Sequence, residues 1–281
     1  MIPTQFDYQR AASIDEAIEM LQSGGKLIAG GHSLVPLMKL RLSEPGALID
    51  IARIPGLSGI RETGGKIEIG AATVHNDVAS SALLREKCPA IADAAGEIGD
   101  PQVRNRGTLG GSLAHSDPSA DYPAVILALD ADINLKGPKG ARTVKASAFF
   151  QDLFTVDLAA DELIVSVTMA AAKASAYAKL HQRASHYAIV GVGAALEVKN
   201  GVIASARLGL TGAGSHATRM TSVEQALAGQ PLSAKTIEAA ATLAGAGMKN
   251  VNADIHASEE YRRAMIPVFT RRALEGAMKR A

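Results

Sequence analysis

The sequence predicts an α+β protein built from three consecutive blocks. Strand-like and helix-like stretches alternate over residues 1–54, which favours a small α/β unit. Residues 55–172 combine β-hairpin patterns with helical segments, and residues 177–281 open with a long hairpin and close with helices. These three ranges are the predicted domains.

The first block begins with a predicted helix over residues 13–23. Ser13 and Glu16 have the spacing of a capping box, and Gly24-Gly25 ends the helical pattern. Short strands are predicted on either side of the next helical segment, at 26–31 (KLIAGG) and 47–51 (ALIDI).

The second block is predicted to contain two β-hairpins, which turn at Gly64-Gly65 and between Gly137 and Gly140. Residues 170–176 (AAAKASA) are predicted to be a linker, although their alanines would also suit a helix. The remaining elements expected here are helices near 75–87 and 90–98 and a strand over 161–169.

The third block is predicted to open with a hairpin over residues 186–212. Asn200-Gly201 is the pair expected of a two-residue type I′ turn. Helices are expected near 222–228, 234–248 and 258–280, the last of them kinked at Pro267.

Composition restricts the classes of function. The chain has 281 residues and a formal charge of +1, which gives no electrostatic reason to expect nucleic acid or an anionic membrane as a partner. No apolar run approaches a membrane span, and the N-terminus lacks a signal-peptide pattern. Cys88 is the single cysteine, so an internal disulfide is excluded and no iron–sulfur cluster is expected in this chain. These features predict a reduced, cytoplasmic protein.

Two glycine pairs, Gly30-Gly31 and Gly110-Gly111, each lead into a predicted helix. Backbone amides at the start of a helix suit a phosphate, and glycine allows the phosphate to approach closely. Each pair alone is more simply explained as a turn. The hydroxyls of Ser33 and Ser112 and the occurrence of two such loops favour a pyrophosphate held from both sides.

Other chemical motifs are weak. Neither glycine loop is followed by Gly-Lys-Ser/Thr, and GVGAAL (191–196) lies in a predicted strand, so Walker and Rossmann signatures are absent. Val35 breaks the G-x-S-x-G pattern that a Ser33 hydrolase would need. His115, Asp117 and Asp121 match no strong metal-site spacing, so no metal is expected, and Asp121 is instead a candidate helix cap. Structural roles are expected for the isolated histidines, His75, His181, His216 and His256.

Four stretches carry a resemblance to a known family: AGGHSLVPLMKLRL, GTLGGSLAHSDPSAD, YAKLHQRASHYAIVGV and YRRAMIPVFTRRAL. In order and spacing they resemble the FAD-binding medium subunit of carbon monoxide dehydrogenase and xanthine dehydrogenase-type molybdenum hydroxylases. The resemblance implies two FAD-binding subdomains of the vanillyl-alcohol-oxidase (PCMH) type and an α+β C-terminal domain. The sequence departs from the family in ASHYA (184–188), because relatives usually have Gly-Asp before the position of Tyr187.

The same resemblance implies non-covalent FAD and assigns residues to it. The first loop would wrap the pyrophosphate, the second would close over it, Asp121 would lie near the ribose, the Leu163 backbone would meet the adenine, and Lys179 and Tyr187 would lie near the flavin. The complete implied set is Lys26, Ala29, Gly30, Gly31, His32, Ser33, Leu34, Thr108, Leu109, Gly110, Gly111, Ser112, Asp117, Asp121, Leu163, Lys179 and Tyr187.

The resemblance also implies a division of labour among subunits. A large molybdenum-cofactor subunit would oxidise the substrate, a small iron–sulfur subunit would relay electrons, and this chain would pass them through FAD to an external acceptor, in a dimer of heterotrimers. No catalytic acid–base residue is therefore expected here. The alternatives are a self-contained FAD oxidase of the same fold, in which His32 would be a candidate covalent anchor, and a non-catalytic nucleotide-binding module.

Overall fold

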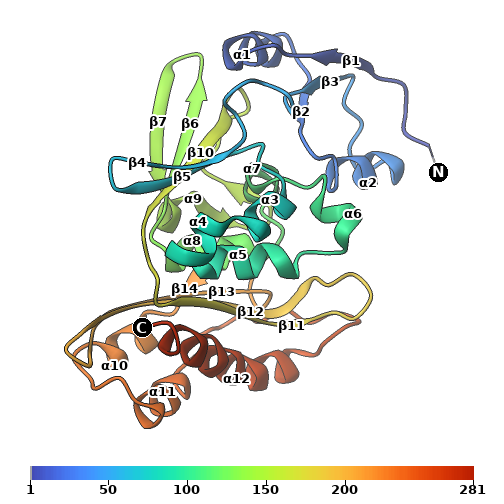
Figure 1. Cartoon of the computed structure of the whole chain (residues 1–281). Coiled ribbons are helices and arrows are strands. Elements are labelled where there is room, and N and C mark those ends of the chain that lie inside the picture. Colours follow the sequence, from blue (N-terminus) through green and yellow to red (C-terminus); the bar gives the residue numbers. More distant parts are fainter. Residues whose placement is uncertain (1) are drawn as a thin grey trace.

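The computed structural model describes residues 2–281, and its larger sheets follow one another along the chain (Figure 1). The first sheet is parallel, in the order β1-β3-β2. Its strands and helices are β1 (Asp7–Arg10), α1 (Ile14–Gln22), β2 (Lys26–Ile28), α2 (Leu34–Lys39) and β3 (Ala47–Asp50).

The predicted capping box at α1 is confirmed, with a small shift. The Ser13 hydroxyl accepts a hydrogen bond from the Glu16 amide at 3.1 Å. The Glu16 carboxylate accepts from the amide of Ala12, one residue before the cap, at 2.6 Å. Gly24 and Gly25 follow at φ +95° and +138°, conformations that L side chains rarely adopt. The sequence therefore defines both ends of this helix.

The second sheet is antiparallel, in the order β4-β5-β10-β6-β7. Both predicted hairpins are present, and Gly64 and Gly65 have positive φ values, as a type I′ turn requires. Its strands are β4 (Ile60–Thr63), β5 (Lys66–Gly70), β6 (Asp132–Gly137), β7 (Gly140–Lys145) and β10 (Leu163–Ala170).

Short helices connect β5 to β6; the helix predicted near 90–98 is present as α5 (Pro89–Glu97), whereas the longer one predicted near 75–87 is divided. The helix predicted over 75–87 is broken at Ser81, which is extended (φ −62°, ψ 117°) and accepts from the Leu84 amide as the cap of the next helix. The helices are α3 (His75–Ser80), α4 (Ala82–Lys87), α5 (Pro89–Glu97), α6 (Pro101–Arg104), α7 (Leu109–His115) and α8 (Tyr122–Ala128). After β7 come α9 (Ala146–Phe149), β8 (Phe150–Asp152) and β9 (Thr155–Val156).

The third sheet has the order β11-β12-β13-β14 and carries the predicted hairpin. Asn200 and Gly201 have φ values of 52° and 75°, which confirms the turn. The predicted linker over 170–176 is wrong at its end, because β11 already begins at Ser175. The strands are β11 (Ser175–His181), β12 (Ala188–Lys199), β13 (Val202–Thr211) and β14 (Thr218–Arg219).

Three helices follow the third sheet: α10 (Thr221–Leu227), α11 (Ala234–Ala241) and α12 (Glu259–Met278). α11 is shorter than the predicted 234–248, and α12 continues through Pro267. In Figure 1, α12 lies under the third sheet and the short helices of the second block lie above it. A Cβ on Gly209 would lie 2.0 Å from the Ala124 carbonyl oxygen of α8. Glycine in the strand therefore allows α8 to pack directly on the sheet.

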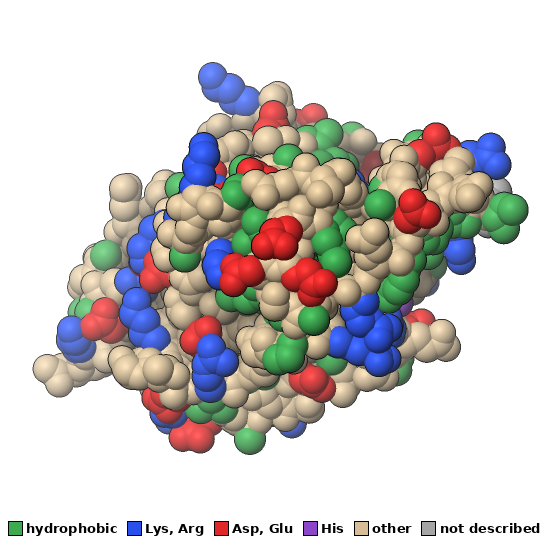
Figure 2. All heavy atoms as spheres, turned by 90° about the horizontal axis from the view of Figure 1, so that it is seen from above, with side chains coloured by type: hydrophobic (Ala, Val, Ile, Leu, Met, Phe, Trp, Pro, Cys, Tyr) green, Lys and Arg blue, Asp and Glu red, His purple; other side chains and the backbone are tan. Residues whose placement is uncertain are grey.

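The buried apolar residues form two clusters. One joins α1, the second sheet and the helices α3, α4, α5, α7 and α8, so the first two blocks share a core. The other joins the third sheet to α10, α11 and α12. On the face shown in Figure 2, basic and acidic side chains are interspersed. Within residues 2–281, no helix has the length and apolar character needed to cross a membrane.

Candidate functional site

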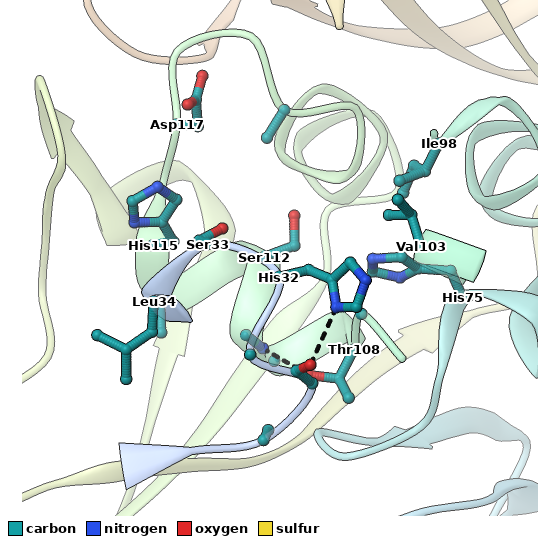
Figure 3. Close-up of a pocket in the computed structure, with 18 of the residues that line it drawn as sticks. His32, Ser33, Leu34, His75, Ile98, Val103, Thr108, Ser112, His115 and Asp117 are labelled. Carbon is teal, nitrogen blue, oxygen red and sulfur yellow. Dashed lines mark hydrogen bonds between the residues drawn. The ribbon is translucent and has the colours of Figure 1, made fainter. Parts of the chain in front are cut away.

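A cavity of about 830 Å³ lies between the two glycine loops and is lined by segments of all three blocks (Figure 3). Every residue that the resemblance assigned to the cofactor lines this cavity except Leu109 and Lys179. Leu109 is fully buried in the core, and the Lys179 side chain is fully buried behind the cavity wall. The fold thus brings together residues that are far apart in the sequence.

The first loop, residues 29–34, follows β2 and leads into α2. Gly31 has φ +75°, a value that favours glycine. Gly30 is required for a different reason, since a Cβ there would lie 2.0 Å from the Arg106 carbonyl oxygen. The first pair therefore combines an unusual backbone angle with a close backbone approach to the chain just before the second loop.

The amides of this first loop are free to bind a ligand. Intrahelical bonding starts only when the Val35 amide donates to the Gly31 carbonyl oxygen at 2.9 Å. Within the described part of the chain, the amides of residues 30–33 donate to no protein acceptor. Such a run of adjacent amides, facing a cavity, can hold an anionic group. His32 Nδ1 lies 3.0 Å from the Gly30 carbonyl oxygen, which orients the ring at the cavity edge.

The second loop is different, because the fold already uses its amides. Leu109 donates to the Thr73 carbonyl oxygen at 3.0 Å and Gly110 to that of Ala71 at 2.8 Å. Gly111 donates to the Thr108 hydroxyl at 3.1 Å, as a helix N-cap bond. The expectation that this loop offers free helix amides is therefore wrong. A Cβ on Gly110 would lie 2.6 Å from the Ala71 Cβ, so that glycine serves packing.

Hydroxyl groups remain as the ligand-facing donors of the second loop. Ser33 and Ser112 both line the cavity, and in the view of Figure 3 His115 and Asp117 lie toward one side of it and Ile98, Val103 and His75 toward the other. The two serines belong to different loops and line the same cavity. That their hydroxyls hold one pyrophosphate from both sides stays a prediction.

His75 is a cavity residue to which the sequence assigned only a structural role. It is 5% exposed, and its Nδ1 lies 3.1 Å from the buried Tyr122 hydroxyl. Burial lowers the pKa of His75 to about 3, with smaller contributions from nearby His32 and Arg104. His75 is therefore neutral near pH 7. A Cβ on Gly107 would lie 2.5 Å from its Nε2, so the ring supports the second loop from behind.

Asp121 does not cap α8, and this correction has a clear cause. Its backbone is already helical (φ −77°, ψ −47°), so the side chain cannot reach the first amides of that helix. Instead it accepts from the Tyr177 hydroxyl at 2.6 Å and pairs with Lys179 at 2.8 Å. Burial raises the pKa of Asp121, and the Lys179 ammonium opposes that rise.

Tyr187 lies one residue before β12, not within the strand as predicted. Its carbonyl oxygen accepts from the Gln182 amide at 2.8 Å, and its side chain is 50% exposed at the cavity. Partial burial raises the pKa of the Tyr187 phenol, so the ring is neutral at ordinary pH. A half-exposed aromatic ring at the cavity is suited to stacking on a planar ligand.

Phe154 also lines the cavity and was not identified from the sequence. It lies between β8 and β9 at φ 50°, is 52% exposed, and its ring centroid is 5.1 Å from that of His115. A phenylalanine with positive φ is unusual and marks a conformation imposed by its surroundings. No local sequence pattern signals it, because the β8–β9 hairpin was not predicted.

Comparisons with known proteins identify the two domains of the chain. The family model described as the FAD binding domain in molybdopterin dehydrogenase matches residues 4–170. The CO dehydrogenase flavoprotein C-terminal domain matches residues 175–277. The carbon monoxide dehydrogenase medium chain of Hydrogenophaga pseudoflava is 39% identical, covering 100% of this chain and 99% of the relative. The 6-hydroxypseudooxynicotine dehydrogenase complex subunit alpha of Paenarthrobacter nicotinovorans is 38% identical, covering 100% and 97%.

Solved structures give the same result. A structure of carbon monoxide dehydrogenase from Hydrogenophaga pseudoflava matches with a TM-score of 0.95 at 40% identity, covering 100% of both chains. Quinoline 2-oxidoreductase from Pseudomonas putida 86 matches with a TM-score of 0.91 at 29% identity, covering 99% of both. The fold and the site define an FAD-binding oxidoreductase subunit with a dedicated C-terminal domain. The chain belongs to the family of FAD-binding medium subunits of carbon monoxide dehydrogenase and xanthine dehydrogenase-type molybdenum hydroxylases.

The residues present fit FAD. The cavity volume is within the range of about 300–1,000 Å³ typical of cofactor sites. Its first loop supplies adjacent free amides for a pyrophosphate, and two serines supply hydroxyl donors. Apolar residues from several elements complete the lining, among them Leu27, Ile28, Leu37, Ile98, Val103 and Leu163.

Proposed function

We propose that this chain is the electron-transfer subunit of a molybdenum hydroxylase, in which it carries FAD between an iron–sulfur subunit and an external acceptor. The observation that supports this most directly is the cavity between the two glycine loops, with free amides on one side and hydroxyls on the other. The partners are a small iron–sulfur subunit and a large molybdenum-cofactor subunit, arranged as a dimer of heterotrimers. Relatives named as a medium chain or medium subunit support a multi-subunit complex.

FAD, when bound, supplies the redox chemistry of this subunit. The residues of the chain bind and orient it. Amides of the first loop and the Ser33 and Ser112 hydroxyls hold the pyrophosphate, Asp121 lies toward the ribose, and the Leu163 backbone lies toward the adenine. Lys26, Thr108 and Asp117 are further polar residues of the lining.

Tyr187 is proposed to lie against or beside the flavin, where it limits solvent access to the ring. No residue of this chain is proposed as an acid or base for the organic substrate. His75 and His115, whose pKa values are both lowered by burial, are suited to remain neutral beside an anionic ligand.

The test is the flavin content of the purified chain. We expect about one FAD per chain, released into the supernatant by acid precipitation. Gly31→Val should abolish binding, because a branched side chain is strained at φ +75° and its Cβ lies 3.1 Å from Val35 Cγ2. Full flavin retention in this variant would contradict the pyrophosphate assignment, and flavin in the acid pellet would identify His32 as a covalent anchor.

A second measurement separates an electron-transfer subunit from a self-contained oxidase. The isolated chain should oxidise no alcohol or aldehyde at a useful rate, yet its flavin should accept electrons from an artificial donor such as dithionite. Rapid turnover of an organic substrate by this chain alone would contradict the proposal. A chain that purifies without flavin and cannot be reconstituted would instead favour a non-catalytic nucleotide-binding module.

A further inference from the structure

Lys179 is fully buried although it carries a charge, and it lies outside the cavity wall. We propose that Lys179 is a positioning residue that fixes two separate segments beside the cavity, the C-terminal end of α5 and the loop of residues 182–187. Any effect of Lys179 on FAD binding rests on the proposed function. The hydrogen bonds by which Lys179 holds the two segments belong to the chain itself.

All three donors of the Lys179 ammonium are used within the protein. Nζ lies 2.8 Å from Asp121 Oδ1, 2.8 Å from the Glu97 carbonyl oxygen and 2.6 Å from the His186 carbonyl oxygen. An ammonium group has three N–H donors and no acceptor. In this arrangement Lys179 has no donor left for a cofactor, so its effect on the cofactor has to be indirect.

Each carbonyl that Lys179 holds belongs to a residue directly before a wall residue. Glu97 precedes Ile98, and His186 precedes Tyr187, and both Ile98 and Tyr187 line the cavity. The two segments come from different blocks of the chain, and the third acceptor, Asp121, also lines the cavity. One side chain thus joins three parts of the wall.

The 182–187 loop depends on this contact. Its other hydrogen bonds are internal: the Gln182 side-chain oxygen accepts from the amides of Ala184 and Ser185, and the Gln182 amide donates to the Tyr187 carbonyl oxygen. Within residues 2–281, the bond from Lys179 is the only hydrogen bond that joins this loop to a residue outside it. Without that bond the loop keeps its own turn and the ring contact between His186 and His181, but it has no hydrogen bond to the rest of the chain.

Neutralising Asp121 is the competing explanation for a buried lysine. A buried carboxylate without a partner is costly, and Lys179 removes that cost. The two explanations separate when Asp121 is made neutral. If Lys179 serves only the charge, it becomes dispensable in an Asp121→Asn background, whereas the two carbonyl bonds are still needed if it holds the wall.

The loop contains a built-in reporter, the exposed Arg183, after which trypsin can cleave. We would compare the full chain with Asp121→Asn and with the double variant Asp121→Asn/Lys179→Met. Cleavage after Arg183 is measured by mass spectrometry of fragments 1–183 and 184–281, relative to cleavage after the exposed Lys249. This readout requires no flavin, so it is independent of the proposed function.

We expect Asp121→Asn to keep Arg183 protected as in the parent chain, and the double variant to be cleaved there at least tenfold faster at an unchanged Lys249 rate. Equal protection in both variants would overturn the proposal. Equally fast cleavage in both would also overturn it, because the charge pair and not the carbonyl bonds would then secure the loop. FAD loss from a fully protected double variant, when Asp121→Asn alone retains FAD, would instead identify Lys179 as a direct ligand.

Discussion

The two glycine loops are alike in sequence, yet the fold uses them differently. In the first, the amides of residues 30–33 donate to no acceptor within the described chain, so the backbone itself is available to a ligand. In the second, the amides of Leu109, Gly110 and Gly111 are bound to Thr73, Ala71 and Thr108. A Gly-Gly pair before a helix can therefore expose amides or bury them. Only the partners that tertiary structure supplies decide which occurs.

The difference has consequences for rigidity and for chemistry. The second loop is fixed by the β5–α3 segment and by the buried His75 ring, so it acts as a preformed wall. The donors of the first loop have no protein acceptor, so a bound ligand would supply hydrogen bonds that the fold itself does not. FAD should therefore stabilise the first loop much more than the second, by linkage between binding and folding.

The largest effect is expected at Gly30, where the two loops meet. A Cβ in Gly30→Ala would overlap the Arg106 carbonyl oxygen at 2.0 Å, so the first loop has to move away from the second. We expect at least a 100-fold loss of FAD affinity, measured by fluorescence titration of the apoprotein. Gly46→Ala is the matched control, since a Cβ there meets no atom within 4 Å. Unchanged affinity in Gly30→Ala would show that contact between the loops is not needed.

Acid should weaken the support of the second loop. The folded-state pKa of His75 is about 3 against about 6.5 in an unfolded chain, so the unfolded state binds the extra proton between these values. The free energy of unfolding should fall as pH drops through this window, by about 3 kcal/mol between pH 7 and pH 4 from this group. Denaturant unfolding at several pH values measures it. In His75→Gln this part of the pH dependence should disappear, and identical profiles for the two proteins would contradict the prediction.

The two serine hydroxyls provide a direct comparison of the loops. Ser112 is among the few ligand-facing donors of the second loop, whereas Ser33 is surrounded by free amides. Hydrogen bonds to charged groups contribute about 1.5–3 kcal/mol, so Ser112→Ala should weaken FAD binding about tenfold or more. Ser33→Ala should weaken it only about threefold. Calorimetric titration with FAD compares the affinity losses of the two variants. A larger loss in Ser33→Ala would contradict the prediction that the second loop depends more on its hydroxyl than the first.

A modest effect on affinity is expected at Tyr187. Stacking contributes about 0.5–1.5 kcal/mol beyond burial, so Tyr187→Ala should lower FAD affinity about tenfold at most. Because the side chain is half exposed at the cavity, its removal should change the flavin spectrum and the rate of reoxidation by oxygen more clearly. Stopped-flow reoxidation measures this. Unchanged rates and an unchanged spectrum would assign Tyr187 a purely structural role.

Local sequence patterns predicted the elements whose ends are marked by side chains. The capping box of α1, the Asn200-Gly201 turn and the Gly64-Gly65 turn are all present, because each depends on residues within a few positions of one another. Where longer helices were expected, Ser81 divides one of them, and α11 ends at Ala241. Periodicity indicates a helical segment but does not show where an interruption by a polar cap falls.

The candidate site was predicted in part, and for a specific reason. The glycine loops and Tyr187 could be named from motifs that resemble a family, and the fold places them at one cavity. His75 and Phe154 could not be identified, because their roles come from contacts with Tyr122 and His115 at a distance along the chain. Asp121 was identified but given the wrong structural role, since its partner Lys179 lies in another block.

The sequence by itself determined the order of the elements, the tight turns and the two places where glycine replaces side chains beside a helix. These features depend on backbone preferences that act over a few residues. Tertiary structure alone decided which loop offers its amides, which histidine is buried and neutral, and how Lys179 joins the cavity wall. Those properties depend on the acceptors and the loss of solvent that distant segments bring to a group, and no neighbouring residue specifies them.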